Sequence, residues 1–419
     1  MSYIRTASVF LVFPALFAAA AWSRDQAGPG NAAFEQGDFL KAADHYTQAL
    51  HSKPSFALYV NLAHCYTRLE RWNDAAQAYR AAIDLDSEAV TAPIWRFLAQ
   101  ALYNDNQFQQ AMKAFSQAES LESDDQDDIW IARCMIELEQ WVQAKSVLLG
   151  RLKRDPSDIG TLELLAYVLG QVEDWPGVMD VYRQLLIASP DHTDYRIALA
   201  NALAGSGRNM QAIDALEFAW RLDRSLSGRI NRLLADLYLA EKMPREAAAC
   251  YARLIVTSEN PSADDYYRLG VTYFQTGELT SAWNAFADML KADPSDSKPD
   301  LYLGHVSAQR GDANEALLHY SAAIEKDPTA VEAFVALADL LMKNRRYEDA
   351  AAYLAKAIEL GDNRPLVHHN LILALMRRTD MEQAVAALKD ALAEHPSDAG
   401  LLSLLDRCVE KMALQDNNP

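Results

Sequence analysis

The sequence predicts an all-α fold in which short helical hairpins follow one another along the chain. Apolar residues recur at helical spacing, and the whole pattern returns about every 34 residues. In the stretch 263–294, Gly270 lies in a first helix that Gly277 ends, and Ala282 and Phe286 lie on one face of a second helix. Helices this short are unstable alone in water, so each must bury its apolar face against neighbouring copies.

Sequence columns keep their register over eleven units. The column of Ala282 holds Ala in ten of them, and the column of Gly270 holds Gly or Ala in ten. Positions equivalent to Gly270 are Gly30, Ala63, Ala99, Ala132, Ala166, Ala200, Ala235, Gly304, Ala338 and Ile372. Positions equivalent to Phe286 are always large: Tyr46, Tyr79, Phe115, Leu148, Tyr182, Leu216, Tyr251, Tyr320, Leu354 and Leu388. Small residues let two helix backbones approach, and a large residue fills the remaining space, so the internal repeat is real.

These columns resemble those of the tetratricopeptide repeat (TPR) family over about Gly30 to Pro396. The resemblance implies a right-handed superhelical solenoid of about eleven helix-turn-helix units, closed by a C-terminal capping helix. We therefore expect residues 24–396 to form the solenoid and residues 397–419 to form the capping helix and tail. The resemblance is specific for the fold and weak for function, because this fold serves many unrelated partners.

Composition excludes some classes of partner. The 419 residues carry a formal net charge of −19, and half of them are hydrophobic. A strongly acidic surface is unsuited to the phosphates of nucleic acid and to a broad basic membrane-binding face. We interpret the charge as a solvated exterior that keeps a long, Ala-rich array soluble.

The first 23 residues are typical of a secretory signal peptide. Arg5 precedes an apolar run, and Ala19 and Ala21 form an A-x-A cleavage site before Trp22. An uncleaved N-terminal membrane anchor is the alternative, although the apolar run is short for a span. Either interpretation predicts an exported protein, periplasmic or attached to the outer face of the inner membrane.

Several stretches along the chain have individual interpretations. Pro93 delays the start of the third unit. Pro176 and Gly177 in the fifth unit make it the least regular and the place to expect a bend. A final helix over about 398–415 has an apolar stripe made of Leu401, Leu402, Leu405, Val409 and Met412.

The stretch 122–128 holds five acidic residues in seven. Such a stretch could bind Ca²⁺, but it lacks the glycine and the ligand spacing of a calcium loop. We favour a helix N-terminus decorated with acids that suit its dipole. The four cysteines are interpreted as small buried hydrophobic residues, because non-neighbouring repeats cannot bring them within disulfide range. They are Cys65, Cys134, Cys250 and Cys408.

No stretch of the sequence carries a recognisable catalytic motif. His368 and His369 are adjacent, and neighbours on a helix point about 100° apart, so they seldom share a metal. We therefore expect no catalytic residues, no metal and no cofactor, and we predict that the protein is not an enzyme.

A TPR solenoid usually acts through its concave face, which the first helices line. The positions two before, two after and five after the Leu269 column are predicted to point there. In units eight to eleven they form an apolar lining that suits an amphipathic helix or an extended peptide of a partner protein. The predicted partner-binding residues are Tyr267, Val271, Phe274, Leu301, His305, Val335, Met342, His369, Leu373 and Met376. The alternative is that these side chains pack against each other or against the following unit.

The leading functional hypothesis is a non-catalytic protein–protein interaction scaffold, in a bacterial envelope assembly, with no nucleic acid partner. A possible membrane tether lies in residues 1–23. The rival hypothesis is a periplasmic ligand- or glycan-binding protein that is accessory to an envelope enzyme. It would use the more polar lining of units five to seven.

Overall fold

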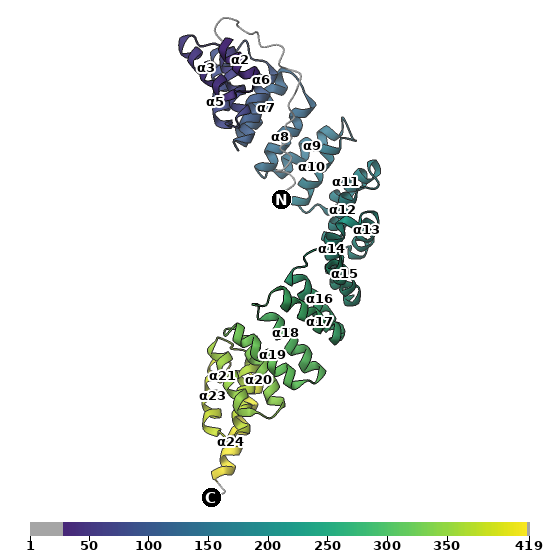
Figure 1. Ribbon diagram of the computed structural model, residues 1–419, viewed down its shortest axis with the longest axis vertical. Helices are drawn as coiled ribbons and strands as arrows, with labels where there is room; N and C mark the ends of the chain where they lie inside the picture. The colour runs from purple at the N-terminus through teal and green to yellow at the C-terminus, as the bar shows by residue number, and fades with distance from the viewer. Residues whose placement is uncertain (1–27, 417–419) are drawn as a thin grey trace. The chain divides into compact units, whose positions relative to one another are not determined.

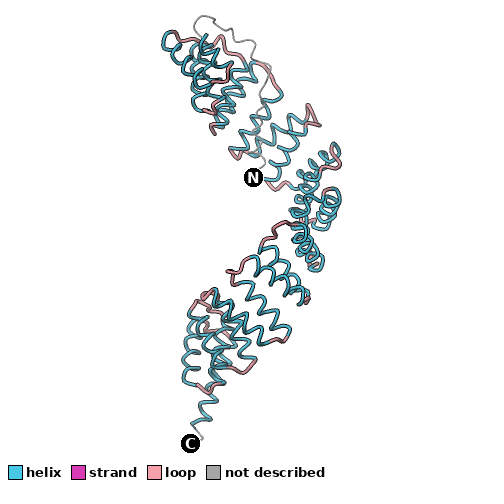
Figure 2. Tube along the Cα trace, viewed as in Figure 1, coloured by secondary structure: helices cyan, strands magenta, loops and turns pink. Residues whose placement is uncertain are grey.

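A computed structural model describes residues 28–416, and within that range the regular elements are α-helices and one 3₁₀ turn (Figures 1 and 2). The all-α fold is therefore confirmed. The chain divides into two compact units, Met1–Ser206 and Gly207–Pro419. The proposed signal peptide or anchor in residues 1–23 lies outside the described residues.

The described part of the first compact unit is built of helical hairpins. Its helices are α2 (Gly28–Glu35), α3 (Phe39–Ser52), α4 (Phe56–Arg68), α5 (Trp72–Leu85), α6 (Ala92–Asn104), α7 (Phe108–Leu121), α8 (Asp125–Glu137), α9 (Trp141–Leu152), α10 (Ile159–Gln171), α11 (Trp175–Ala188) and α12 (Thr193–Gly205). Pro93 and Pro176 each lie in the first turn of a helix, where the missing N–H leaves no bond unmade.

The second compact unit continues the same pattern. Its elements are α13 (Asn209–Leu222), the 3₁₀ turn η1 (Arg224–Leu226), α14 (Ser227–Ala240), α15 (Pro244–Thr257), α16 (Ala263–Thr276), α17 (Leu279–Ala292), α18 (Lys298–Arg310), α19 (Ala313–Lys326), α20 (Val331–Lys343), α21 (Tyr347–Glu359), α22 (Pro365–Arg377), α23 (Met381–Glu394) and α24 (Ala399–Asp416). Among residues 28–416, no helix is both long enough and apolar enough to cross a membrane.

A left-handed backbone residue separates the two helices of each predicted unit. Among the described residues twelve have positive φ; Gly361, after α21, is one, and the eleven in these turns are Gly37, Glu70, Asn106, Glu139, Glu173, Gly207, Lys242, Gly277, Gly311, Arg345 and Thr379. Only four are glycine, although this conformation costs other residues about 1–2 kcal/mol. The hairpin geometry requires a positive φ at this position, so the tertiary fold overrides the preference of these residues for negative φ. Ten of these turns join two helices of one compact unit, and they locate ten hairpins independently of the sequence columns. The turn at Gly207 lies between α12 and α13, where the two compact units meet in the sequence.

The small and large columns meet as the repeat predicts. A Cβ added to Gly270 would lie 2.6 Å from the ring of Phe286. The same contact would be 2.5 Å between Gly304 and Tyr320. In these hairpins the aromatic ring therefore rests directly on the backbone of the first helix, and glycine alone leaves room for it.

The tyrosines of the large column make a second recurring contact. In four hairpins the tyrosine hydroxyl bonds to a polar side chain fifteen residues earlier, on the first helix. The pairs are Tyr46 with Asn31 (2.6 Å), Tyr79 with His64 (2.9 Å), Tyr251 with Asp236 (2.9 Å) and Tyr320 with His305 (2.9 Å). Each bond satisfies a phenol whose ring is buried in the hairpin core.

The acidic stretch at 122–128 forms the start of α8 and is engaged by arginines of the first compact unit. Asp124 caps the helix by accepting from the backbone N–H of Gln126. The Asp127 carboxylate accepts from the Arg96 guanidinium at 2.9–3.0 Å, and Asp128 pairs with Arg154. This agrees with the interpretation of the stretch as a helix N-terminus.

All four cysteines are free and buried, as the sequence predicts. Burial raises the pKa of the Cys65 and Cys134 thiols to about 12, so the reactive thiolate is scarce at neutral pH. Cys408 lies against Met376, with 3.7 Å between the sulfurs.

The stripe predicted for the final helix needs correction. Among the side chains of α24 that the structure describes, 399–411, the buried ones are Leu401, Leu404 and Cys408. The side chain of Met412, the last residue of the predicted stripe, lies outside that range. Leu402, Leu405 and Val409 are exposed. The helix does pack on α22 and α23 as a cap would, but it uses a face rotated from the predicted one. The predicted apolar face of α24 was wide, so the sequence did not show which side of it α22 and α23 would cover.

We predict that Thr379→Gly stabilises the eleventh hairpin by about 1 kcal/mol, since Thr379 is a β-branched residue at φ 67°. Native-state hydrogen exchange of the α22 amides measures the opening free energy. The reverse substitution Gly277→Ala, at φ 78°, is the control and should destabilise its own hairpin. An unchanged or faster exchange of α22 in Thr379→Gly would show that the turn stores no strain.

We predict an acid-sensitive contribution from His64. Burial lowers its pKa to about 4, whereas the unfolded imidazole titrates near its ordinary 6.5. Between these values the unfolded state binds more protons, so the free energy of unfolding falls as the pH falls, by roughly 3 kcal/mol at most. His64→Asn keeps an acceptor for Tyr79, as Asn31 does for Tyr46, and should remove most of this loss.

Urea denaturation of both proteins at pH 7 and pH 4.5 measures the effect. Exposed His51 provides the control substitution, His51→Asn, which should leave the pH dependence as it is. Parallel losses in the wild type and in His64→Asn would contradict the assignment to His64.

Candidate partner-binding face

The predicted partner-binding residues come from four successive first helices of the second compact unit. These are α16, α18, α20 and α22. Each of these helices packs on its own second helix and on the second helix of the preceding unit. The side that faces neither of them is the one that could meet a partner. The structure places the ten predicted residues in three different environments.

Tyr267 is half-buried against the following hairpin. Its hydroxyl lies 3.0 Å from that of Tyr302 on α18, and the two rings meet edge to face with centroids 5.2 Å apart. The Tyr302 ring stacks on Phe286 at 5.0 Å. Burial and the hydrogen bond to Tyr267 together raise the pKa of the Tyr302 phenol. For Tyr267, packing against the following unit is therefore part of its role.

His305 likewise has an internal partner. Its Nδ1 lies 2.9 Å from the Tyr320 hydroxyl, and its ring meets Tyr302 edge to face at 5.8 Å. Burial lowers its pKa, which favours the neutral imidazole that can accept from the phenol. Tyr267, Tyr302, His305 and Tyr320 thus form a continuous aromatic row that fixes the geometry of α16 and α18.

Five apolar candidates lie partly buried at the edge of the core. They are Val271, Phe274, Val335, Met342 and Leu373. Each has lost part of its surface to the core and keeps the rest accessible. This is the state expected of apolar side chains that can take part in a second, intermolecular contact.

Two predicted residues are wrong as surface contacts. Leu301 is 7% exposed and Met376 is 2% exposed, so both belong to the core. Met376 is covered by α24, whose Cys408 lies against its sulfur and whose Lys411 ammonium reaches its carbonyl at 3.5 Å. The capping helix occupies the space that the prediction left open.

His369 is half-buried next to the start of α24. Its Nδ1 is buried and has no hydrogen-bond partner. Its Cδ2 lies 3.6 Å from the position that a Cβ on Gly400 would take. His369 therefore lies at the end of the row, where α22 meets the cap.

One half-buried carboxyl group interrupts the apolar character of this surface. Asp339, between Val335 and Met342 on α20, accepts from the Asn370 side chain at 3.0 Å. Burial raises its pKa. The surface thus combines apolar and aromatic area with isolated hydrogen-bonding groups, an arrangement suited to binding a polypeptide segment.

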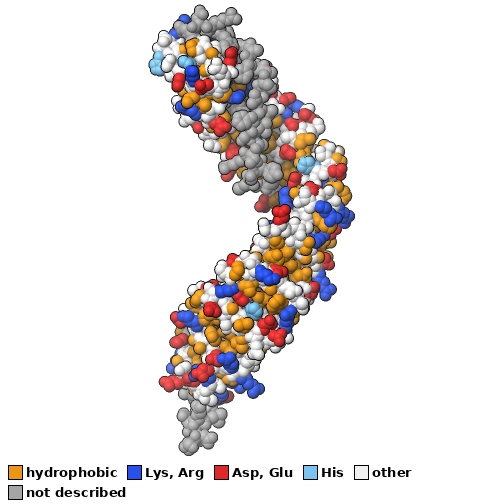
Figure 3. Space-filling view, viewed as in Figure 1, with side chains coloured by type: hydrophobic (Ala, Val, Ile, Leu, Met, Phe, Trp, Pro, Cys, Tyr) orange, Lys and Arg blue, Asp and Glu red, His pale blue; other side chains and the backbone are white. Residues whose placement is uncertain are grey.

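We call the eight remaining residues the first-helix face. They are Tyr267, Val271, Phe274, His305, Val335, Met342, His369 and Leu373. Hydrophobic side chains gather over the region of α16–α20 in the space-filling view (Figures 1 and 3).

Sequence reasoning missed the tyrosine pairs that order this surface. The signal was available, because a polar residue stands fifteen positions before four of the five tyrosines in the large column. It also missed Tyr302, which follows Leu301 on α18 and faces the preceding hairpin. Residues one position apart on a helix differ by about 100° in direction, so a small error in phase exchanges core and surface.

The chain is similar to several known repeat proteins. It is 24% identical to the Protein CTR9 homolog of Arabidopsis thaliana over 336 residues. This alignment covers 77% of this chain and 31% of that protein. It is 23% identical over 337 residues to the human Protein O-mannosyl-transferase TMTC3, which covers 78% of this chain and 34% of that protein. The chain thus spans about a third of the length of these relatives.

Among solved structures, the chain resembles one described as the crystal structure of APC/C hetero-tetramer Cut9-Hcn1. The TM-score is 0.37 at 14% identity, over 91% of this chain and 95% of that one.

Sequence models described as "Tetratricopeptide repeat" match residues 30–90, 68–128, 233–297 and 307–375, which together make up more than half of the chain. The fold is one whose typical role is a scaffold for contacts between proteins. The chain belongs to the tetratricopeptide repeat family.

Proposed function

We propose that this protein is a non-catalytic scaffold that binds a segment of a partner protein on the first-helix face, within an exported envelope assembly. One observation carries the proposal: partly accessible apolar side chains recur on α16, α20 and α22 at equivalent positions of the repeat. A helical repeat presents such positions in a row, so one extended partner can contact several of them together.

The size of the row suggests the size of the partner. Neighbouring packed helices lie about 10 Å apart, so four first helices span about 30 Å. An α-helix of about 20 residues has this length. We therefore propose an amphipathic helical segment as the bound element, with its apolar side on Phe274, Val335 and Leu373. The net charge of −19 favours a segment that is basic on its other side.

The proposed compartment rests on residues 1–23. Arg5, the apolar run and the A-x-A site together favour export, followed by cleavage or by retention as an anchor. The acidic composition and the sequestered cysteines are compatible with an oxidising compartment.

Charge placed on the first-helix face should abolish partner binding. In the triple variant Phe274→Asp, Val335→Asp, Met342→Asp, each carboxylate would be desolvated by an apolar partner surface. Partners are captured from the envelope fraction with the wild-type chain and identified. The captured partner's amphipathic segment is then made as a labelled peptide. We expect its affinity for the triple variant to fall at least about 30-fold, the loss of one strong contact.

A matched control places the same charges elsewhere. Val256 on α15 and Leu318 on α19 are 84% and 67% exposed, and both lie on second helices. The variant Val256→Asp, Leu318→Asp should bind like the wild type, and circular dichroism should show equal helix content in all three proteins. Undiminished binding by the triple variant would refute the proposed face. Capture of a glycan with no protein would favour the rival ligand-binding function.

Export makes a separate prediction. When the full chain is expressed in a Gram-negative host, the intact mass of the periplasmic product should correspond to a chain beginning at Trp22, after the A-x-A site. A product that retains Met1 and sediments with membranes would support the anchor instead. Recovery of the whole chain in the cytosol would contradict export in either form.

A further inference from the structure

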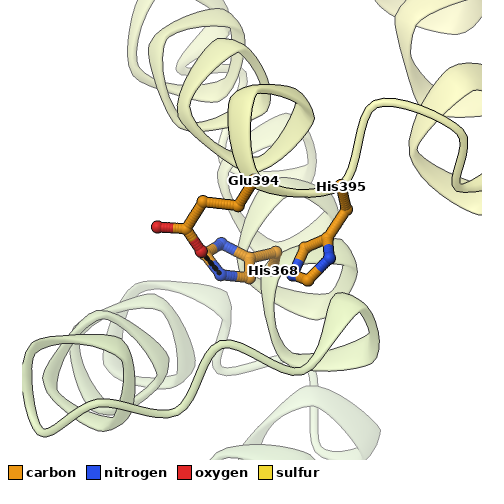
Figure 4. A group of neighbouring side chains, drawn as sticks. All are labelled: His368, Glu394 and His395. Carbon is orange, nitrogen blue, oxygen red and sulfur yellow. Dashed lines mark ion pairs between the residues drawn. The ribbon is translucent and has the colours of Figure 1, made fainter.

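Three potential metal ligands meet at the end of the last hairpin. His368 lies on α22, Glu394 is the last residue of α23, and His395 follows it. Each offers one ligand atom, and these atoms all lie within 4.8 Å of one another (Figure 4). In Figure 4 the Glu394 carboxylate and the His395 ring approach the His368 ring from two sides.

The central imidazole is buried and incompletely bonded. His368 is only 5% exposed, and its Nε2 has no hydrogen-bond partner. The nearest opposite charge is the Glu394 carboxylate, whose oxygen lies 3.8 Å from that nitrogen, beyond hydrogen-bond distance. A buried polar atom left in this state is destabilising, so its presence calls for an explanation.

We propose that His368, Glu394 and His395 form a binding site for a divalent transition metal, with Zn²⁺ as the best match. Two imidazoles and one carboxylate are a donor set that zinc accepts in tetrahedral sites. Hard ions such as Mg²⁺ and Ca²⁺ prefer oxygen ligands alone, and this pair of histidines disfavours them.

The site needs only a small closure to hold the ion. Ligand atoms bound to one tetrahedral zinc at about 2.0–2.1 Å lie about 3.3 Å apart. The Glu394 side chain is 56% exposed at the last turn of its helix, so it is free to move toward the buried His368. His395 follows the same helix end. Rotation of two side chains at a helix terminus therefore suffices, and the core need not move.

The surroundings favour a cation at this place. The carboxylates of Glu394, Asp362 and Asp390 all act electrostatically on His368.

The second histidine is already oriented by the preceding loop. Nε2 of His395 lies 2.5 Å from the carbonyl oxygen of Asn363, between α21 and α22. A metal bound through Nδ1 would keep this contact as its outer-shell hydrogen bond, and one bound through Nε2 would replace it.

Zinc at this place would join the end of α23 to the first turn of α22. Three protein ligands also leave the fourth position open to water or to a side chain of a bound partner. Sequence reasoning did not anticipate the site, and this proposal replaces the expectation of no metal. His368 precedes Glu394 by 26 positions and His395 by 27, a spacing that matches no zinc motif, and only the hairpin brings the three together.

The test is calorimetric titration of the full, chelator-treated chain with Zn²⁺. We expect one equivalent to bind and the unfolding temperature to rise with it. Glu394→Gln changes an exposed side chain and removes the charged ligand, so it should weaken binding at least about tenfold. His395→Ala should do the same, while circular dichroism of both variants stays that of the wild type.

Glu382→Gln is the matched control, because it makes the same substitution on an exposed residue of the same helix. It should bind zinc with wild-type affinity. The proposal is overturned if the wild-type chain binds no zinc, or if zinc binds Glu394→Gln and His395→Ala as tightly as the control. A loss of affinity in Glu382→Gln equal to that in Glu394→Gln would also overturn it, because it would indicate a diffuse charge effect.

Discussion

The contact on which the hairpins depend is the approach of a large side chain to the backbone of its neighbouring helix. In the Gly270–Phe286 and Gly304–Tyr320 pairs, the ring lies so close that an added Cβ would overlap it. Van der Waals contact at this distance is dense, and it fixes how the two helices of a hairpin are spaced. The alanines of the second helices are fully buried beside these contacts, as at Ala282 and Ala316. The repeat is thus a repeated solution to one packing problem.

This packing also decides which surface remains available. The side of each first helix that holds the small residue is buried against the second helix of the same hairpin. The neighbouring positions then divide between contacts to the next hairpin, as at Tyr267 and His305, and partly accessible apolar side chains, as at Phe274 and Leu373. The aromatic row and the tyrosine hydrogen bonds link α16 to α18 and α18 to α19 across this surface. In the function that we propose, such preorganisation would lower the entropy lost on binding. At the hairpin of α22 and α23, α24 covers Met376.

The fold could be predicted from the sequence in detail, because the periodic columns record short-range packing directly. Ala282, Phe286 and the buried cysteines lie where the columns placed them. The left-handed turns were harder to predict: Glu173 and Thr379 give no local signal for positive φ, and tertiary structure imposes it. Burial was mispredicted where the apolar face of a helix was wide enough to pack on either of its two sides. Leu402 was expected to be buried and Leu404 was not, and Met376 was assigned to the surface because the position of α24 over it is a long-range contact. The His368, Glu394 and His395 cluster belongs to the same class, since only the folded hairpin joins its members.

A double-mutant cycle on Gly270 and Phe286 tests the packing most directly. The substitutions Gly270→Ala and Phe286→Leu each introduce a residue that the same column carries in other hairpins. Alone, Gly270→Ala should destabilise its hairpin, because the new methyl group overlaps the ring. In the Phe286→Leu background, Gly270→Ala should instead stabilise the hairpin relative to Phe286→Leu alone, because alanine favours a helix over glycine by about 0.5–1 kcal/mol. We predict a coupling energy above about 1 kcal/mol between Gly270→Ala and Phe286→Leu. Additive effects would contradict the claim that the ring on the small residue sets the hairpin.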